Sequence, residues 1–120
     1  MQDNRIQSER NRLIAILKGV NIPSKKQDVL CGVIDNLAWM RVKLDDTREQ
    51  MTEESVTVAY DNGGGQTGIR ENPIFKGYEK LLHSYIENLK VYASFLPVDL
   101  QDEVIDDGMT MLSRVREMRQ

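Results

Sequence analysis

The sequence predicts a mainly α fold in which long antiparallel helices are joined by a small β-hairpin. Apolar residues recur at spacings of three and four over most of the 120 residues, as on one face of an α-helix. The spacing changes to two only over residues 55–60, and a glycine-rich segment follows. The three prolines, at positions 23, 73 and 97, separate the helical segments from one another.

The composition is typical of a single globular domain. The chain is 40% hydrophobic and 29% charged. No apolar run approaches the roughly 18 residues of a membrane span, and the first residues lack the layout of a secretory signal. Cys31 is the single cysteine, so no internal disulfide can form, and we expect a reducing compartment.

Residues 3–18 predict the first helix. Gly19 suits the C-terminal end of a helix, and Pro23 cannot continue it. Arg10 falls inside the apolar arc, in conflict with the pattern. The residues that share this arc, at about 100° per residue, are Ile6, Leu13, Ile14, Leu17 and Val20.

Residues 24–51 predict a second and longer helix, which would extend for about 42 Å at roughly 1.5 Å per residue. Ser24 and Gln27 fit the capping-box pattern at its start, in which two side chains satisfy backbone N–H groups. The apolar residues that recur along it every seven positions are Leu30, Leu37, Leu44 and Met51.

Residues 55–60 alternate as a short strand does, and a return strand through residues 67–69 would complete a hairpin. Consecutive glycines at positions 63–65 lie between the two. An alternative interpretation is a phosphate-binding loop, because the glycine spacing matches the Walker motif. Ile69 and Arg70 stand where that motif needs Lys and Ser or Thr, so we expect a turn without nucleotide binding.

Asn72 and Pro73 mark the start of the third helix, since Asn is a good N-cap and Pro suits the first helical position. The helix is expected to end near Leu96. Its apolar stripe is broad enough for contacts on two sides, which predicts self-association. The residues expected at an oligomer interface are Phe75, Tyr78, Leu82, Tyr85, Leu89, Tyr92 and Leu96.

A fourth helix is expected over residues 98–120, with Asp99 as its N-cap. Acidic residues come early, including Asp102 and Glu103, and arginines come late, including Arg114 and Arg116. This order suits the helix dipole, whose N-terminal end is positive.

The net charge of −3 is distributed unevenly, because residues 1–26 hold six basic residues against two acidic ones. A basic segment on an acidic protein favours a polyanionic partner such as DNA. A solvated amphipathic helix explains the same residues without a partner, and the second helix is too long for a typical recognition helix. The candidate DNA contacts are Arg5, Arg12, Lys18, Lys25 and Lys26.

No group of residues indicates catalysis or metal binding. His83 is the single histidine, and Cys31 has no histidine near it in the sequence. Adjacent carboxylates such as Asp45 and Asp46 point about 100° apart on a helix, so they do not converge on one substrate atom. We therefore expect a protein that is not an enzyme and that binds no cofactor and no metal.

Three stretches follow one another in a specific order: VIDNLAWMRVKLDD, SVTVAYDNGGGQTG and ENPIFKGYEKLLHSYIENL. In this order they resemble the small terminase subunits of tailed phages, in particular the short members from phages of Gram-positive bacteria. The resemblance covers about residues 28–97, and its best markers are Asn72-Pro73, the glycines before them and the aromatic-rich helix after them. An obvious separate helix-turn-helix domain, present in better-known members, is missing.

The resemblance implies a homo-oligomeric ring in the host cytoplasm that recognises double-stranded phage DNA. It also implies a regulatory partner, the large terminase subunit, which carries the ATPase and nuclease. Residues 1–23 would form a basic N-terminal helix, residues 24–97 the oligomerisation core and residues 98–120 a C-terminal helix. The alternative is a helical oligomeric adaptor or inhibitor of a host factor, with no role on DNA.

Overall fold

A computed structural model describes residues 3–53, 57–61 and 67–118 of the chain. Within these residues the fold is mainly α, as the spacing of apolar residues predicted, with four helices and two short strands. In chain order the elements are α1 (Asn4–Ile16), α2 (Ser24–Thr52), β1 (Thr57–Asp61), β2 (Thr67–Glu71), α3 (Pro73–Ala93) and α4 (Val98–Met118).

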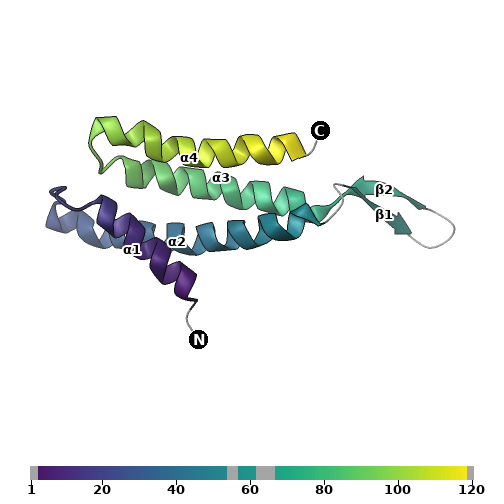
Figure 1. Cartoon of the computed structure of the whole chain (residues 1–120), viewed down its shortest axis with the longest axis horizontal. Coiled ribbons are helices and arrows are strands. Elements are labelled where there is room, and N and C mark those ends of the chain that lie inside the picture. Colours follow the sequence, from purple (N-terminus) through teal and green to yellow (C-terminus); the bar gives the residue numbers. More distant parts are fainter. Residues whose placement is uncertain (1–2, 54–56, 62–66, 119–120) are drawn as a thin grey trace.

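The helices α2, α3 and α4 lie side by side with α3 in the middle, and α1 crosses α2 (Figure 1). Consecutive long helices run in opposite directions, and the hairpin extends beyond them at the end where α2 meets α3 (Figure 1). The molecule measures 64 × 34 × 23 Å and has a radius of gyration of 18.0 Å. A compact chain of this length has a radius of gyration of about 14 Å, so this one is elongated.

The two strands pair antiparallel, with Thr57 opposite Glu71, which confirms the expected hairpin pairing. The consecutive glycines at positions 63–65 lie outside the described residues, and so does the prediction that they form a turn. Residues 54–56, where the first strand was expected to begin, also lie outside them.

Several helix ends follow their sequence signals. The Asn72 side chain accepts a hydrogen bond from a backbone N–H of the first turn of α3, and Pro73 is the first helical residue. Asp3 caps α1 in the same way. Gly19, in the turn after α1, has a φ of +86°, a left-handed conformation that only glycine adopts without strain.

Two expected caps are wrong. Ser24 is the first residue of α2, its N-cap position is taken by Pro23, and no side chain caps this end. Gln27 instead donates a hydrogen bond to a carbonyl oxygen of the α1–α2 connection. Helix α4 begins at Val98, so Asp99 lies within its first turn, where a carboxylate still favours the positive end of the helix dipole.

The apolar stripe of α3 forms the centre of the core. None of its seven residues is more than 4% exposed, because α2 packs on one side of α3 and α4 folds back over the other. The stripe is therefore buried by helices of its own chain. Another subunit would have to pack on other surfaces. Six of the seven residues lie on α3: Phe75, Tyr78, Leu82, Tyr85, Leu89 and Tyr92. The seventh, Leu96, lies in the turn after α3, which ends at Ala93 and not near Leu96 as expected.

The packing of α4 on α3 depends on a close approach at Gly108. A Cβ atom at this position would lie 2.9 Å from Cγ1 of Ile86 and 3.2 Å from Cδ2 of Leu89. Glycine removes that obstacle and lets the two helices come together, which is how α4 covers the second side of the stripe.

Candidate functional site

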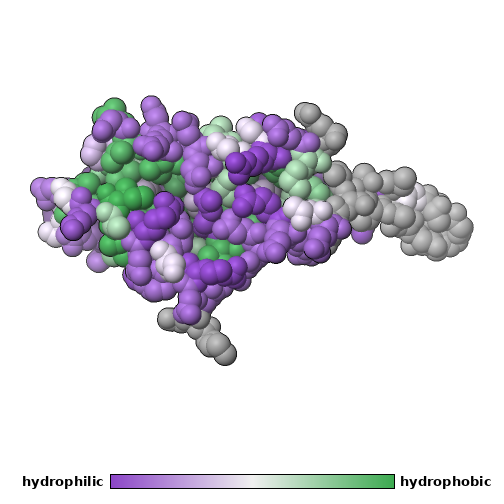
Figure 2. All heavy atoms as spheres, in the orientation of Figure 1, coloured by the Kyte–Doolittle hydropathy of each residue, from purple (hydrophilic) through white to green (hydrophobic). Residues whose placement is uncertain are grey.

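A cleft of about 580 Å³ opens between α1 and α4, above α3. Apolar side chains line one part of it, and charged side chains line the rest. Figure 2 shows apolar atoms gathered at the end of this face where α1 ends and α4 begins, with hydrophilic atoms over most of the remainder. The apolar lining residues are Leu13, Ile16, Leu89, Tyr92, Leu100 and Val104.

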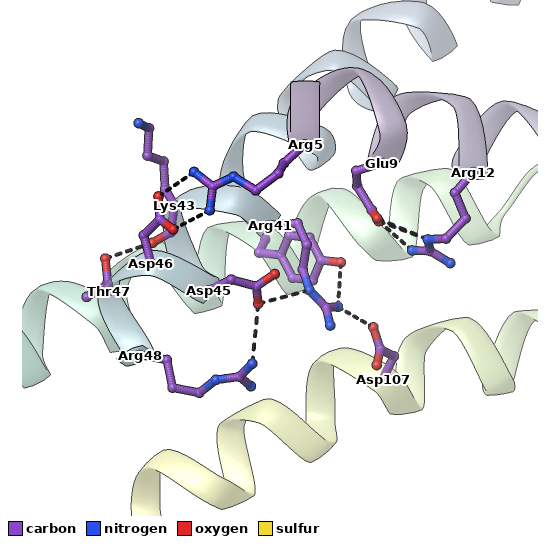
Figure 3. Close-up of polar contacts among 11 residues, drawn as sticks. Arg5, Glu9, Arg12, Arg41, Lys43, Asp45, Asp46, Thr47, Arg48 and Asp107 are labelled. Carbon is purple, nitrogen blue, oxygen red and sulfur yellow. Dashed lines mark hydrogen bonds and ion pairs between the residues drawn. The ribbon is translucent and has the colours of Figure 1, made fainter. Parts of the chain in front are cut away.

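Arg41, on α2, links three helices beside this cleft. Its Nη1 lies 2.6 Å from Oδ2 of Asp107 on α4 and 3.4 Å from the hydroxyl of Tyr85 on α3 (Figure 3). Its Nε lies 3.4 Å from Oδ1 of Asp45, one turn away on α2. Burial acts to lower the pKa of Arg41, but the bonds to Tyr85 and Asp107 outweigh it and raise that pKa, so the guanidinium stays charged.

Tyr92 fixes the floor of the cleft. Its hydroxyl donates a buried hydrogen bond of 2.8 Å to the backbone carbonyl oxygen of Leu13, which joins α3 to α1. Desolvation raises the pKa of Tyr92 to about 12. The phenol therefore remains protonated at neutral pH and keeps its role as a donor.

The candidate DNA contacts Arg5 and Arg12 lie on α1 in ion pairs within the chain. Arg5 pairs with Asp3 at 2.8 Å and with Asp46 of α2 at 2.5 Å. Arg12 pairs with Glu9 at 2.5 Å (Figure 3). The hydrogen bonds from Arg5 lower the pKa of both aspartates, and the bond to Glu9 raises the pKa of Arg12. Both arginines are thus locally neutralised.

Arg10, whose place in the apolar arc conflicted with the pattern, also forms an ion pair. Its Nε lies 2.5 Å from Oδ1 of Asp35 on α2. A long arginine stem can lie along apolar surface while its charged end reaches the rim, which resolves the conflict. The acidic partners on α2 were missed in the sequence because they are 25 and 41 residues from their arginines.

The other three candidates, Lys18, Lys25 and Lys26, are exposed and surround the connection between α1 and α2. This connection lies at the end of the molecule opposite the hairpin (Figure 1). None of the ion pairs found in the described part of the chain involves these lysines. They are the members of the predicted set whose charge is available to a partner.

A second groove, of about 600 Å³, lies between α1 and the outward face of α2. Trp39 lines it and is 49% exposed, with the ammonium of Lys43 5.7 Å from the centre of its ring. Sequence reasoning did not single out this tryptophan. The signal available was a large aromatic residue on the polar face of an amphipathic helix, away from the heptad of leucines.

Little else in the described residues brings reactive groups together. His83 and Cys31 are exposed on different helices. Among residues 3–53, 57–61 and 67–118, no three His, Cys, Asp or Glu side chains are grouped so that they could hold a metal ion. No helix in those segments is long and apolar enough to cross a membrane.

Comparisons of the chain with protein-family models, curated proteins and solved structures found no match. Function is therefore inferred from the residues themselves and from the geometry that the fold gives them.

Proposed function

We propose that the protein is a small terminase subunit, a non-enzymatic ring that recognises phage DNA and regulates the large terminase subunit during genome packaging. The observation that carries this proposal is the order of the parts. A long helix leads into a projecting hairpin, and a second long helix opened by Asn72 and Pro73 returns along the first. This is the order in which the sequence resembles that family.

The shape of the chain supports assembly. An isolated two-stranded hairpin is marginally stable in water, and this one extends past the helices that precede and follow it. A neighbouring subunit packed against the hairpin would stabilise it. Helical surfaces also retain exposed apolar side chains that such contacts would cover, among them Val91, Val98 and Met109.

The surface best suited to DNA is the cluster of Lys18, Lys25 and Lys26. A ring would display this cluster once per subunit, so weak phosphate contacts would add through multivalency. Each phosphate contact contributes roughly 0.9 to the slope of log affinity against log salt concentration. Arg5 and Arg12 contribute less, because acidic neighbours already neutralise them.

DNA binding is tested by fluorescence anisotropy across a salt series, with DNA from the packaging region of the phage that encodes the protein. Replacing Lys18, Lys25 and Lys26 together by Glu should weaken binding by about tenfold or more and reduce the salt slope. The matched control reverses three exposed lysines of α3 and should leave the slope unchanged: Lys76, Lys80 and Lys90. If both variants lose DNA affinity equally, the lysine cluster is not the DNA surface.

Assembly and regulation are tested separately. Light scattering should give a mass several times the 13.8 kDa of one chain. Adding the protein to the large subunit should change the ATPase rate of that subunit. A monomer at micromolar concentration, with no effect on the ATPase, contradicts the proposal.

One observation favours the alternative, a helical adaptor or inhibitor of a host factor. Arg5, Arg10 and Arg12 are all paired with carboxylates of the same chain, which reduces the positive charge offered to DNA. A stoichiometric complex with a host protein, in a chain that binds no DNA from its own packaging region, would support this function.

A further inference from the structure

The outward face of α2 is not covered by another helix of the chain. In Figure 1, α2 forms one edge of the helical layer, with α3 beside it and α1 across it. Val29 and Trp39 on this face are 59% and 49% exposed. The residues that lie along it, spaced three and four apart, are Lys25, Val29, Gly32, Asn36, Trp39, Lys43 and Asp46.

Gly32 has no explanation inside one chain. A Cβ atom there would meet no other atom within 4 Å, so the space is open. Glycine is one of the least favourable residues in a helix interior, and alanine would fit without any change. Gly77 on α3 is equally open, so an open glycine alone does not indicate a partner; beside the exposed Val29 and Trp39, however, Gly32 leaves room on this face for a helix to approach closely.

We propose that this face of α2 forms a two-fold contact with the same face of a second copy of the chain. In such a contact the two α2 helices run antiparallel, and every pair of facing residues occurs twice. With the axis beside residues 35 and 36, Trp39 of each copy lies level with Gly32 of the other. The indole then covers the open position, and Val29, one turn away, extends the apolar contact.

The charges on this face are complementary in the same register. Lys43 lies level with Asp28, at the edge of this face on the second copy. Lys25 lies level with Asp46, which also pairs with Arg5 of its own chain, so the Lys43–Asp28 pair is the main charge contact. All four side chains are at least partly exposed. Because of the two-fold axis, each lysine–aspartate pair occurs twice, once at each end of the contact. For each kind of pair, one copy supplies the lysine at one end and the aspartate at the other end. A face that complements itself in this way fits a second copy of the chain.

Helix α1 provides a wall for the second copy. Ile6 and Arg10 line the groove beside Trp39, and Arg10 is held there by its ion pair with Asp35. Ile14, one turn further along α1, is 46% exposed. A helix seated on α2 would therefore also touch apolar side chains on α1.

The size of the contact sets its expected strength. Stable interfaces bury about 1,200–2,000 Å² in total, and one helix face with part of another lies at or below the low end of that range. Association in the micromolar range is expected. This contact is separate from the proposed ring, which requires a head-to-tail contact on other surfaces; a two-fold contact on α2 would pair chains of two rings or two free chains. Lys25 is the one residue placed in both the DNA surface and this contact, so the variants that test the contact leave it unchanged.

The register is tested by charge reversal and mixing, with sedimentation velocity as the measurement. Lys43→Glu and Asp28→Lys each bring like charges together twice, and each should weaken the step that doubles the mass by about tenfold. In a mixed dimer the two reversed side chains face each other with opposite charge, and the second pair is the native Lys43 with Asp28. Association of the mixture should therefore return to nearly the wild-type value. If mixing the two variants does not restore association, this register is wrong.

Trp39 reports the contact directly, because it is the only tryptophan in the chain. As concentration rises through the association range, its emission should shift to shorter wavelength and its quenching by acrylamide should fall. Emission and quenching that stay constant while the mass doubles would place the contact elsewhere and overturn the proposal.

Gly32→Gln separates association from folding. The longer side chain has open space within one chain, so the melting temperature of dilute protein should be unchanged or higher. It blocks the position of the indole, so dimerisation should weaken by about tenfold or more. The matched control is Gly77→Gln on α3, another open helical glycine, which should associate like the wild type. Wild-type association of Gly32→Gln would also contradict the proposal.

Discussion

Gly32 on α2 and Gly108 on α4 both lie in the interior of a helix, yet their surroundings are opposite. A Cβ at Gly108 would lie 2.9 Å from Cγ1 of Ile86, whereas a Cβ at Gly32 would touch nothing. The first glycine is explained by the packing of α4 on α3. The second has no such role within the chain, and the proposed two-fold contact would give it one. The comparison separates a glycine that serves folding from one that folding does not require.

The same difference holds for whole helices. Helix α3 is packed on both sides, and the large side chains of its apolar stripe are buried to within a few per cent of completely. Helix α2 buries one side against α3 and part of another against α1, and it leaves Val29 and Trp39 half exposed. Substitutions on α3 should therefore change the stability of the chain, and substitutions on the outward face of α2 should change its association.

The largest effect is expected from Leu82→Ala in the centre of α3. Removing a fully buried leucine costs about 2–5 kcal/mol, because apolar contact is lost and a cavity remains. Trp39→Ala, on the outward face of α2, should cost less than about 1 kcal/mol in the isolated chain. Urea unfolding below the association range measures both. If the two variants lose similar unfolding free energy, the outward face of α2 is packed against another part of the chain.

The next effect compares the two glycines by the same substitution. Gly32→Ala should stabilise the chain by up to about 1 kcal/mol, since alanine is the better helix former. Gly108→Ala gains the same propensity but must displace Ile86, at a cost of about 1–3 kcal/mol. The two variants should therefore differ by about 1–3 kcal/mol in unfolding free energy. If the two variants are equally stable, α4 can move on α3 to accommodate the new methyl group at position 108 without a loss of unfolding free energy.

Much of the fold was visible in local sequence. The starts of α1 and α3, the turn at Gly19 and the pairing of β1 with β2 all depend on residues close together in the chain. The exact first residue of a helix was harder to predict at Ser24 and Asp99. Both residue types favour the N-cap position and also suit the first turn, so the sequence does not distinguish the two positions.

The candidate site was less predictable because it depends on distant pairs. The breadth of the α3 stripe predicted contacts on two sides, and helices α2 and α4 of the same chain make them. Nothing local indicated that α4 would return to cover the stripe. The charge of Arg5 and Arg12 was also counted correctly, but Asp46, the partner of Arg5 on another helix, is 41 residues away. Only the fold distinguishes these paired arginines from the exposed lysines beside the α1–α2 connection.

A smaller effect is expected at the join between α1 and α3. Tyr92→Phe keeps the ring in the core but removes the hydroxyl that bonds to the carbonyl oxygen of Leu13. A lost hydrogen bond of this kind costs about 0.5–1.5 kcal/mol. Hydrogen exchange should show faster opening of α1 in this variant, with little change in α4. Uniform loss of protection in all helices would contradict a local role for this bond.

The smallest effect is expected at Asp46, on the exposed rim between α1 and α2. Arg5 lowers the pKa of Asp46 below its ordinary value of 3.8, so the ionised form favours the folded state. This stabilisation is complete above the unfolded pKa and disappears as the pH falls through the lower, folded pKa. The pair is solvent-exposed and Arg5 keeps Asp3 as a second partner, so the contribution is small and screened by salt.

Asp46→Asn therefore tests whether this rim contributes to the fold. At neutral pH and low salt the variant should melt slightly below the wild type, at concentrations where the chain does not associate. The difference should narrow on adding salt and should vanish in acid, where the wild-type carboxyl is also protonated. A difference that persists unchanged at acid pH would assign the effect to packing of the side chain. In that case Asp46 would stabilise the chain by packing, as the core residues around α3 do, and not by its charge.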